Sequence, residues 1–441
     1  MKRVRIFVCN VAMLAFVVAA FGVQDVTSAD DWPRFRGPNG TGVVEAALPT
    51  EWSADKNLLW SIDMPGYGSS SPIILGDNLY ITCYTGYGID AENPGSPSDL
   101  QRHLICMNKN SGEEVWRSTV DSTNDEDAYQ GFITEHGFAS STPATDGEHI
   151  FCFFGKTGAV AFDLEGNQVW NTNLGTFSDP YKWGGGGPSP LLYKDLVIIN
   201  AGIVGHQIVA LNKADGEVAW KIEDSGFTNS WTTPILVNTN GRDELVASMP
   251  SKVMGINPEN GEVFWTAASP LTETTCASLG EHEGIVVAMG GRGGVAVAVQ
   301  CGGEGDVSAT HTAWQEPLRA GIGTPVVVDG NLYWNARGIA YCADCETGEV
   351  VFEDRLPAAA GGASGQRRPG GSYGSPIVAG GHVYLQMRDG TMHVLKAGDS
   401  LEVVASNSFG EENGLFSATP AVSGDQLYIR SNQKLYCVKA E

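Results

Sequence analysis

The sequence predicts an all-β protein, a single eight-bladed β-propeller of four-stranded antiparallel blades that is closed by an N-terminal strand completing the last blade. Three observations predict this fold. A turn-and-strand segment recurs along the chain, a Ser/Thr-Pro dipeptide opens most repeats, and the two ends of the chain carry complementary parts of one repeat. Repeats of about 45 residues that contain four short strands are typical of propeller blades.

The recurring segment has the pattern Asn/Asp-x-x-x-Gly-Glu-x-x-Trp. It occurs at 108–116, 212–220 and 257–265, with Phe in place of Trp at 344–352 and one residue shorter at 163–170. The Asn or Asp side chain caps a turn, Gly supplies a positive φ, and the aromatic residue returns to a packed layer. We therefore predict that one set of residues lies in this packed layer: Trp60, Trp116, Trp170, Trp220, Trp265 and Trp314.

The starts of the repeats are equally regular. Proline at the first position of a strand costs no hydrogen bond of the sheet. The dipeptides that precede an apolar run are Ser71-Pro72, Thr142-Pro143, Ser189-Pro190, Thr233-Pro234, Thr324-Pro325, Ser375-Pro376 and Thr419-Pro420. The fifth repeat lacks this proline near Cys276 but keeps the spacing of its apolar strand and of Trp314.

The two ends of the chain are complementary. The last repeat, 420–439, supplies three strands, whereas 58–62 reads as a fourth strand without its predecessors. Pairing these segments closes the ring and removes an exposed sheet edge. The alternative is an open β-solenoid with capping ends.

The sequence divides into a signal peptide at 1–29, an N-terminal extension at 30–57 and the propeller at 58–441. Basic residues precede an apolar run at 6–21, and the small residues Thr27-Ser28-Ala29 suit signal peptidase. The alternative is a membrane anchor, for which the apolar run is short. We therefore predict a periplasmic or secreted protein.

The negative net charge limits the classes of molecule that the protein can bind. Removal of 1–29 changes the formal net charge from −24 to −26, and such a surface repels nucleic acid and anionic lipid. We expect no nucleic-acid partner, no stable membrane insertion and a monomer. The even number of cysteines that remain permits disulfides, including one between Cys342 and Cys345. However, Cys106, Cys342 and Cys437 occupy a third-strand position that is Ala or Gly in other repeats, which favours small buried side chains.

The repeat resembles the PQQ repeat of quinoprotein-alcohol-dehydrogenase-like propellers, on the Asn/Asp-x-x-x-Gly-Glu-x-x-Trp segments described above. The resemblance implies that the tryptophans of these segments dock neighbouring blades: Trp60, Trp116, Trp170, Trp220, Trp265 and Trp314. Segments 31–39, 135–143 and 410–420 resemble an exported, non-catalytic subgroup, and the assembly propeller BamB is similar but more distant. The resemblance implies that dehydrogenases of this family hold the quinone with adjacent cysteines and a calcium ion bound by Glu, Asn and Asp. This sequence has no adjacent Cys-Cys pair and no haem motif. We therefore do not assign PQQ with calcium as a cofactor, and it stays as the disfavoured alternative.

The longest loops are predicted to share one face of the ring. Segments 85–102, 121–138 and 355–373 join strands two and three or successive blades, and both kinds of connection lie on the same side. Aromatic residues precede several first strands, and we expect them to surround the channel mouth or, alternatively, to pack between blades. They are Tyr67, Phe138, Trp183, Trp231, Tyr373 and Phe416.

The candidate ligand-binding residues at this mouth are His136, Glu135, Trp183, Trp231, Tyr373 and Arg367. A His beside a Glu suits acid–base chemistry, but a turn-stabilising His is more common, so we assign no catalytic residue. Acidic residues at 121 and 125–127 lack the spacing of a calcium loop, so we assign no metal site and expect a solvated loop. The sequence thus predicts an exported binding or scaffold propeller that recognises a protein segment or small ligand. The alternatives are a PQQ-dependent oxidoreductase and a hydrolase or lyase centred on His136.

Overall fold

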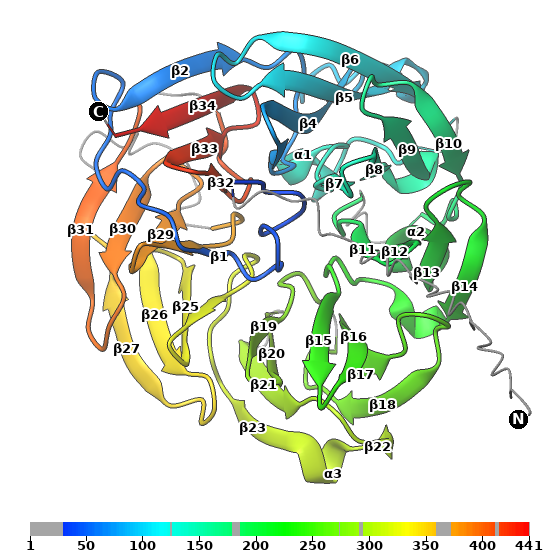
Figure 1. Cartoon of the computed structure of the whole chain (residues 1–441), viewed down its shortest axis with the longest axis vertical. Coiled ribbons are helices and arrows are strands. Elements are labelled where there is room, and N and C mark those ends of the chain that lie inside the picture. Colours follow the sequence, from blue (N-terminus) through cyan, green and yellow to red (C-terminus); the bar gives the residue numbers. More distant parts are fainter. Residues whose placement is uncertain are drawn as a thin grey trace, which may run out of the picture.

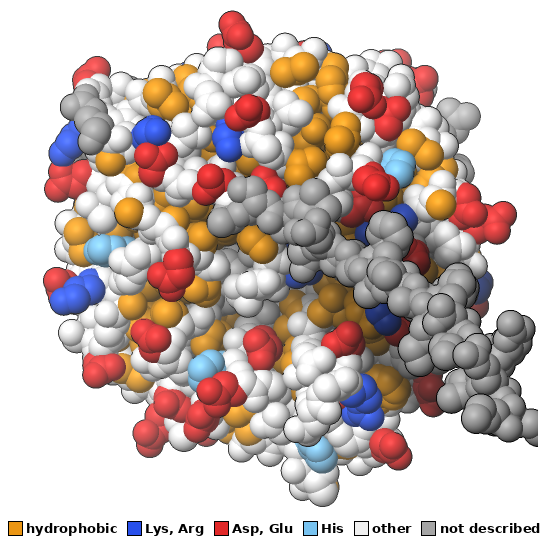
Figure 2. All heavy atoms as spheres, viewed as in Figure 1, with side chains coloured by type: hydrophobic (Ala, Val, Ile, Leu, Met, Phe, Trp, Pro, Cys, Tyr) orange, Lys and Arg blue, Asp and Glu red, His pale blue; other side chains and the backbone are white. Residues whose placement is uncertain are grey.

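The computed structural model of the protein describes residues 30–440 except 124–125, 179–185, 273, 291–293, 359–371 and 411–413. Eight sheets, each built on four antiparallel strands, stand around a central axis, and the chain passes from one to the next in order (Figure 1). The predicted eight-bladed propeller is therefore confirmed. Figure 2 shows acidic side chains spread around the rim of one face, in agreement with the formal net charge of −24.

In each blade the first strand lies nearest the axis and the fourth lies outermost (Figure 1). The first blade contains β3 (Ile73–Leu75), β4 (Asn78–Thr85), β5 (Gln101–Asn108) and β6 (Glu114–Asp121). The second contains β7 (Ala144–Thr145), β8 (His149–Phe153), β9 (Ala159–Asp163) and β10 (Gln168–Thr172). The third contains β11 (Leu191–Tyr193), β12 (Leu196–Asn200), β13 (Gln207–Asn212) and β14 (Val218–Glu223). The fourth contains β15 (Ile235–Thr239), β16 (Arg242–Met249), β17 (Lys252–Ile256), β18 (Val263–Ala268) and the added β22 (Gly305–Asp306).

The remaining blades follow the same plan. The fifth contains β19 (Gly280–His282), β20 (Ile285–Gly290), β21 (Val295–Gln300) and β23 (Thr312–Glu316). The sixth contains β24 (Val326–Val328), β25 (Asn331–Ala336), β26 (Ile339–Asp344) and β27 (Val350–Arg355). The seventh contains β28 (Ile377–Ala379), β29 (His382–Gln386), β30 (Met392–Lys396), β31 (Glu402–Asn407) and, from the extension, β1 (Val43–Val44). The eighth contains β32 (Ala421–Ser423), β33 (Gln426–Arg430), β34 (Lys434–Lys439) and β2 (Leu58–Asp63).

The helices are single turns in the connections. They are η1 (Pro97–Asp99), α1 (Ile133–His136), η2 (Gly155–Thr157), α2 (Gly202–Gly205), η3 (Ser225–Phe227) and α3 (Ser308–His311). Within the described part of the chain, no helix has the length and apolar character needed to cross a bilayer.

The two ends of the chain seal the ring as predicted. Strand β2 pairs antiparallel with β34, and Trp60 lies opposite Cys437 in the register. The Trp60 ring lies 6.1 Å from the Tyr428 ring, measured between centroids. Figure 1 shows the blue β2 strand beside the red β34 strand. A closed ring therefore replaces the alternative of an open solenoid.

The small third-strand residues have a clear packing reason. Each lies directly opposite the aromatic residue of the fourth strand, as in the pairs Cys106–Trp116, Ala210–Trp220 and Cys342–Phe352. A larger side chain would compete with the aromatic ring for the same space. Every described cysteine is a free thiol, so the Cys342–Cys345 pair is not bridged. Burial raises the pKa of the Cys342 thiol to about 11.

Five of the six predicted docking tryptophans contact the following blade in one way. The indole N–H donates to a backbone carbonyl in the third-to-fourth-strand turn of the next blade, at 2.8–3.1 Å. The pairs are Trp60–Lys109, Trp116–Leu164, Trp170–Lys213, Trp220–Pro258 and Trp314–Cys345. The ring also lies against the glycine of that turn, so that a Cβ on Gly216 would stand 2.6 Å from the Trp170 ring. This contact explains why the repeat requires glycine there.

Trp265 is placed differently. Its indole N–H donates to the buried carboxylate of Glu244, on the same blade, at 2.6 Å. The next blade has no Asn/Asp-x-x-x-Gly turn, and β22 and α3 occupy that part of the chain instead. Because the usual carbonyl acceptor is missing, Glu244 takes its place.

Candidate functional site

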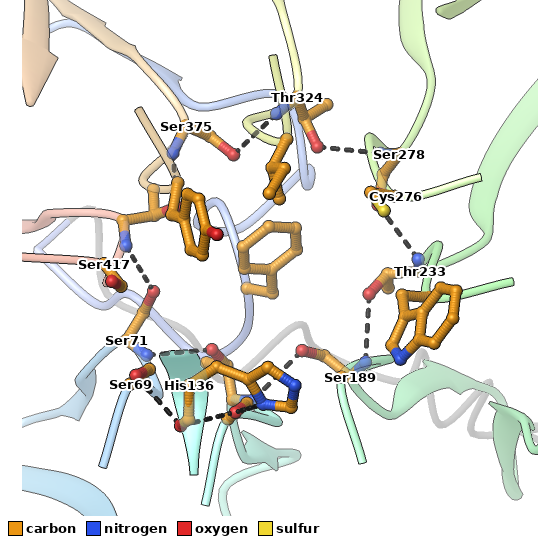
Figure 3. Close-up of a pocket in the computed structure, with 18 of the residues that line it drawn as sticks. Ser69, Ser71, His136, Ser189, Thr233, Cys276, Ser278, Thr324, Ser375 and Ser417 are labelled. Atoms are coloured by element: carbon orange, nitrogen blue, oxygen red, sulfur yellow. Dashed lines mark hydrogen bonds between the residues drawn. The ribbon is translucent and has the colours of Figure 1, made fainter. Parts of the chain in front are cut away.

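A closed ring of hydrogen bonds surrounds the axis where the first strands begin. In each blade a serine or threonine donates its backbone N–H to the hydroxyl oxygen of the corresponding residue in the next blade, at 2.9–3.1 Å. Figure 3 shows several of these bonds around the cavity. The eight members, called here the hydroxyl ring, are Ser71, Thr142, Ser189, Thr233, Ser278, Thr324, Ser375 and Thr419.

The hydroxyl ring lines a cavity of about 210 Å³ on the propeller axis, called here the central cavity. Each ring oxygen is already an acceptor for a backbone N–H. Within the described residues, none of the eight hydroxyls donates to another protein group. A hydroxyl carries one donor and two acceptor positions, so eight donors remain for whatever occupies the cavity.

The N-terminal extension closes one end of the central cavity. It forms backbone hydrogen bonds from Trp32 to Ile74 in the first blade and from Thr145 in the second blade to Pro33. Arg36 then donates to the carbonyl of Pro325 in the sixth blade, at 2.8 Å. The extension therefore crosses the axis, as the dark-blue segment in Figure 1 shows, and Phe35 forms part of the cavity lining.

Helix α1 brings Glu135 and His136 to the rim of the cavity. The Glu135 carboxylate pairs with Arg388 at 2.6 Å, and the same guanidinium lies over the Tyr373 ring at 4.1 Å. The His136 Nδ1 lies 2.9 Å from Ser140 Oγ, whose hydroxyl donates to the His136 carbonyl at 3.0 Å. The pair stabilises the turn that follows α1.

Comparison with known proteins identifies the family. A family model described as outer membrane protein assembly factor BamB matches residues 100–352 and 283–441.

The chain belongs to this BamB family.

Solved structures give the same fold at low sequence identity. BamB from Moraxella catarrhalis is 13% identical with a TM-score of 0.56, covering 87% of this chain and 99% of that chain. Quinohemoprotein alcohol dehydrogenase from Comamonas testosteroni is 12% identical with a TM-score of 0.62, and the match covers 93% of this chain and 80% of that chain. The computationally designed Ika8 protein is 9% identical with a TM-score of 0.55, and the match covers 87% of this chain and 99% of that chain. No curated protein matches the sequence. The predicted resemblance to BamB and to quinoprotein propellers is thus confirmed at the level of family and fold.

The structure of this BamB-family chain brings four of the six candidate ligand residues to one place. Glu135, His136, Trp231 and Tyr373 all line the central cavity. Trp183 and Arg367 lie outside the described residues. The hydroxyl ring, Phe35 and Phe132 were not predicted from the sequence. The Ser/Thr-Pro dipeptides carried the signal for the ring, but the prediction of the first strands rested only on their prolines.

Other aromatic residues that were expected at the channel mouth pack elsewhere. Phe138 is buried against Tyr84 and Tyr87, where segments 86–100 and 126–138 meet. Phe416 is buried and stacks on Tyr436. These two residues therefore pack against other side chains and are not among the described residues that line the central cavity. Tyr67 belongs to the same cluster as Phe138.

The expectation of a solvated acidic loop is wrong for two of its members. Glu126 forms an ion pair with Arg102 at 2.8 Å, and each side chain is only 3% exposed. Asp127 pairs with Lys156 at 2.7 Å. These carboxylates neutralise buried cations that the sequence pattern did not reveal, while Asp125 lies outside the described residues. The pairing holds segment 126–138 against the second blade.

The residues of the central cavity do not fit a calcium-bound quinone. Among the described residues its one lining carboxylate is Glu135, which Arg388 already neutralises. Its one lining cysteine is Cys276, which has no cysteine beside it in the sequence. The donor set that the resemblance to quinoprotein dehydrogenases implies is therefore not assembled here.

Proposed function

We propose that the protein is an exported binding propeller that holds an uncharged, oxygen-rich group in its central cavity. The group belongs to a small ligand or to the tip of a partner's protein segment. The observation that carries this proposal is the hydroxyl ring, whose eight donors surround one cavity. A ligand rich in hydroxyl, ether or carbonyl oxygens supplies the acceptors that the ring lacks.

The other lining residues support this ligand class. No Lys or Arg is among the described residues that line the cavity, so a charged anionic ligand would find no counter-charge there. Trp231, Phe132 and Tyr373 add apolar faces beside the hydroxyls. Aromatic faces combined with a few placed polar groups are typical of small-ligand sites. We infer export from the signal-like segment 1–29, which peptidase cleavage before Asp30 would remove.

Cys276 provides a probe of cavity occupancy. It lines the cavity and is partly exposed, whereas the other described cysteines are buried. Loss of solvation by the surrounding side chains raises the pKa of its thiol to about 11, so alkylation is followed at mildly alkaline pH. We expect a bound ligand to slow alkylation of Cys276, read by mass spectrometry, across a panel of neutral sugars, polyols and capped peptides.

A matched pair of variants tests the assignment. Trp231→Leu removes an aromatic face from the cavity, whereas Phe264→Leu removes a half-buried ring from β18 on the same blade, outside the lining. We expect protection of Cys276 to be lost only in Trp231→Leu. Equal loss in both variants, or no protection by any compound, would contradict the proposal. Dye reduction after addition of PQQ and calcium would instead support the oxidoreductase alternative.

A further inference from the structure

Arg36 is a buried cation whose charge no described carboxylate neutralises. Its side chain is 3% exposed, and one terminal nitrogen, Nη2, donates to the carbonyls of Thr41 and Pro325 at 2.5 and 2.8 Å. The other two nitrogens, Nε and Nη1, are buried and have no hydrogen-bond partner among the described residues. A buried donor without a partner is costly, and a buried charge without a counter-charge costs more.

Arg34, a half-buried residue two positions earlier, adds a second positive charge to the lining of a small cavity that Arg36 also lines. It donates from Nε and Nη2 to the carbonyl of Pro38 at 3.0 and 2.9 Å. No described carboxylate forms an ion pair with Arg34 or Arg36, although acidic residues outnumber basic ones by 51 to 27 in the whole chain. In such an acidic protein, two neighbouring arginines without a carboxylate indicate that another anion is expected there.

A small cavity lies beside these two side chains. Its volume is about 20 Å³, and its lining combines Arg34, Phe35, Arg36 and Gly40 with the first strands of the third, fourth and fifth blades. A space of roughly 10–15 Å³ on this measure holds one water molecule. The cavity therefore admits a single small species, and it is too small for a sugar, a nucleotide or a peptide side chain. We name it the floor cavity, because it adjoins the central cavity at Phe35, Thr233 and Ser278.

We propose that the floor cavity binds one monovalent anion of halide size, held by Arg36 and Arg34, and that this ion supplies the counter-charge which the protein itself does not. Burial lowers the pKa of Arg36 to about 9 and that of Arg34 to about 10, so both remain cations at neutral pH. A water molecule would fill the same space but leave the charge uncompensated. Because Arg36 ties the extension to the sixth blade, the ion strengthens the closed end of the central cavity.

The test measures the thermal unfolding midpoint of the full chain at constant ionic strength. Gluconate, which is too large for the floor cavity, is replaced stepwise by chloride, bromide or iodide. A ligand that binds only the folded state stabilises it in proportion to the logarithm of its concentration, once that exceeds the dissociation constant. We expect the thermal unfolding midpoint to rise by a constant step for each tenfold increase in halide concentration. A midpoint that does not differ between halide and gluconate overturns the proposal.

Two variants separate the site from general salt effects. Arg36→Gln removes the buried charge, whereas Arg319→Gln removes an exposed arginine and changes the net charge equally. We expect the halide step to vanish in Arg36→Gln and to persist in Arg319→Gln. Equal steps in all three proteins would show a bulk salt effect and overturn the proposal.

A crystallographic measurement covers the case in which Arg36→Gln does not fold. Crystals of the unaltered protein grown with bromide should show an anomalous peak beside the Arg36 guanidinium. A water molecule there, without anomalous signal at a bromide concentration well above that of the stability series, overturns the proposal.

Discussion

The backbone N–H of Thr419 donates to the hydroxyl of Ser71 at 3.1 Å, across 348 positions of the chain. This bond closes the hydroxyl ring between the eighth and first blades. At the outer edge, the pairing of β2 with β34 joins the two ends of the chain within the eighth blade. The propeller is thus sealed at both its inner and its outer radius, by side chain–backbone bonds near the axis and by a strand at the rim.

Removing one hydroxyl of the ring should destabilise the protein measurably. In Ser71→Ala the buried N–H of Thr419 loses its acceptor, and a buried unsatisfied donor costs about 1–3 kcal/mol. Ser71→Thr keeps the hydroxyl and should remain close to the original stability, since threonine occupies other positions of the ring. Urea unfolding measures the difference. Equal stability of the alanine and threonine variants would show that the hydroxyl does not contribute to closure.

Trp220 should contribute strongly to the junction between the third and fourth blades. Its side chain is 7% exposed, donates to the Pro258 carbonyl at 3.0 Å and lies against Gly261. Trp220→Ala should lower the free energy of unfolding by about 3–5 kcal/mol, the range for large buried aromatic residues. Val218→Ala, on the same strand but 51% exposed, is the control and should stay within about 0.5 kcal/mol. Similar losses in both variants would contradict the docking role.

The glycine of the repeat has two roles that a pair of variants can separate. Gly216 and Gly381 have nearly the same backbone angle, with φ of +72° and +75°. Alanine at either position carries the strain of a left-handed conformation, about 1–2 kcal/mol. Only at Gly216 does the new Cβ also meet an indole ring, that of Trp170 at 2.6 Å, while nothing lies within 4 Å at Gly381.

We therefore expect Gly216→Ala to be the more destabilising of the two by about 1–3 kcal/mol, the usual cost of overpacking. Chemical denaturation of both variants under the same conditions gives the comparison. If the two losses agree within error, conformational strain alone accounts for this glycine and the packing explanation fails.

The sequence predicts the parts of this fold that repeat and leaves open the parts that occur once. The blades, their order and the β2–β34 closure follow from a period and from two incomplete ends, which are properties of the chain alone. The hydroxyl ring joins residues that lie 44 to 71 positions apart between consecutive blades, and it becomes visible only when the blades stand in a circle. The serine and threonine were present in the pattern, but nothing local indicated which N–H each oxygen would accept.

The path of the N-terminal extension could not be predicted from the sequence either. Segment 30–57 has no counterpart elsewhere in the chain, so no comparison of repeats reveals that it crosses the axis. Its contacts with the first, second and sixth blades decide where Phe35 and Arg36 lie. The same holds for Trp265, whose altered partner depends on the added strand β22 rather than on its own well-formed repeat motif.

Two buried histidines should make the protein lose stability in mild acid. His103 bridges Thr85 and Thr119, with ring nitrogens 2.8 and 2.9 Å from the two hydroxyls, and His393 lies 2.8 Å from the Ser406 hydroxyl. Burial lowers the pKa of both side chains below the ordinary value of 6.5. The unfolded chain therefore takes up these protons at a higher pH than the folded protein does.

The sign of the effect follows from this difference. Above about pH 7 both states leave the imidazoles neutral, and the histidines add no pH dependence. As the pH falls through 6.5, the unfolded state binds protons first, so the free energy of unfolding decreases. The decrease continues until the lowered pKa of the folded state is reached. Urea unfolding at pH 7.5, 6.5 and 5.5 should show this fall, over a range that lies above the titration of ordinary carboxylates.

His103→Gln and His393→Gln test the assignment, because glutamine retains a hydrogen-bonding side chain but takes up no proton. Each single variant should reduce the loss of stability between pH 7.5 and 5.5, and the double variant should reduce it by the sum. The two sites lie on different blades and share no hydrogen-bond partner, so their effects should add. A loss in the double variant as large as in the unaltered protein would assign the acid sensitivity to other groups.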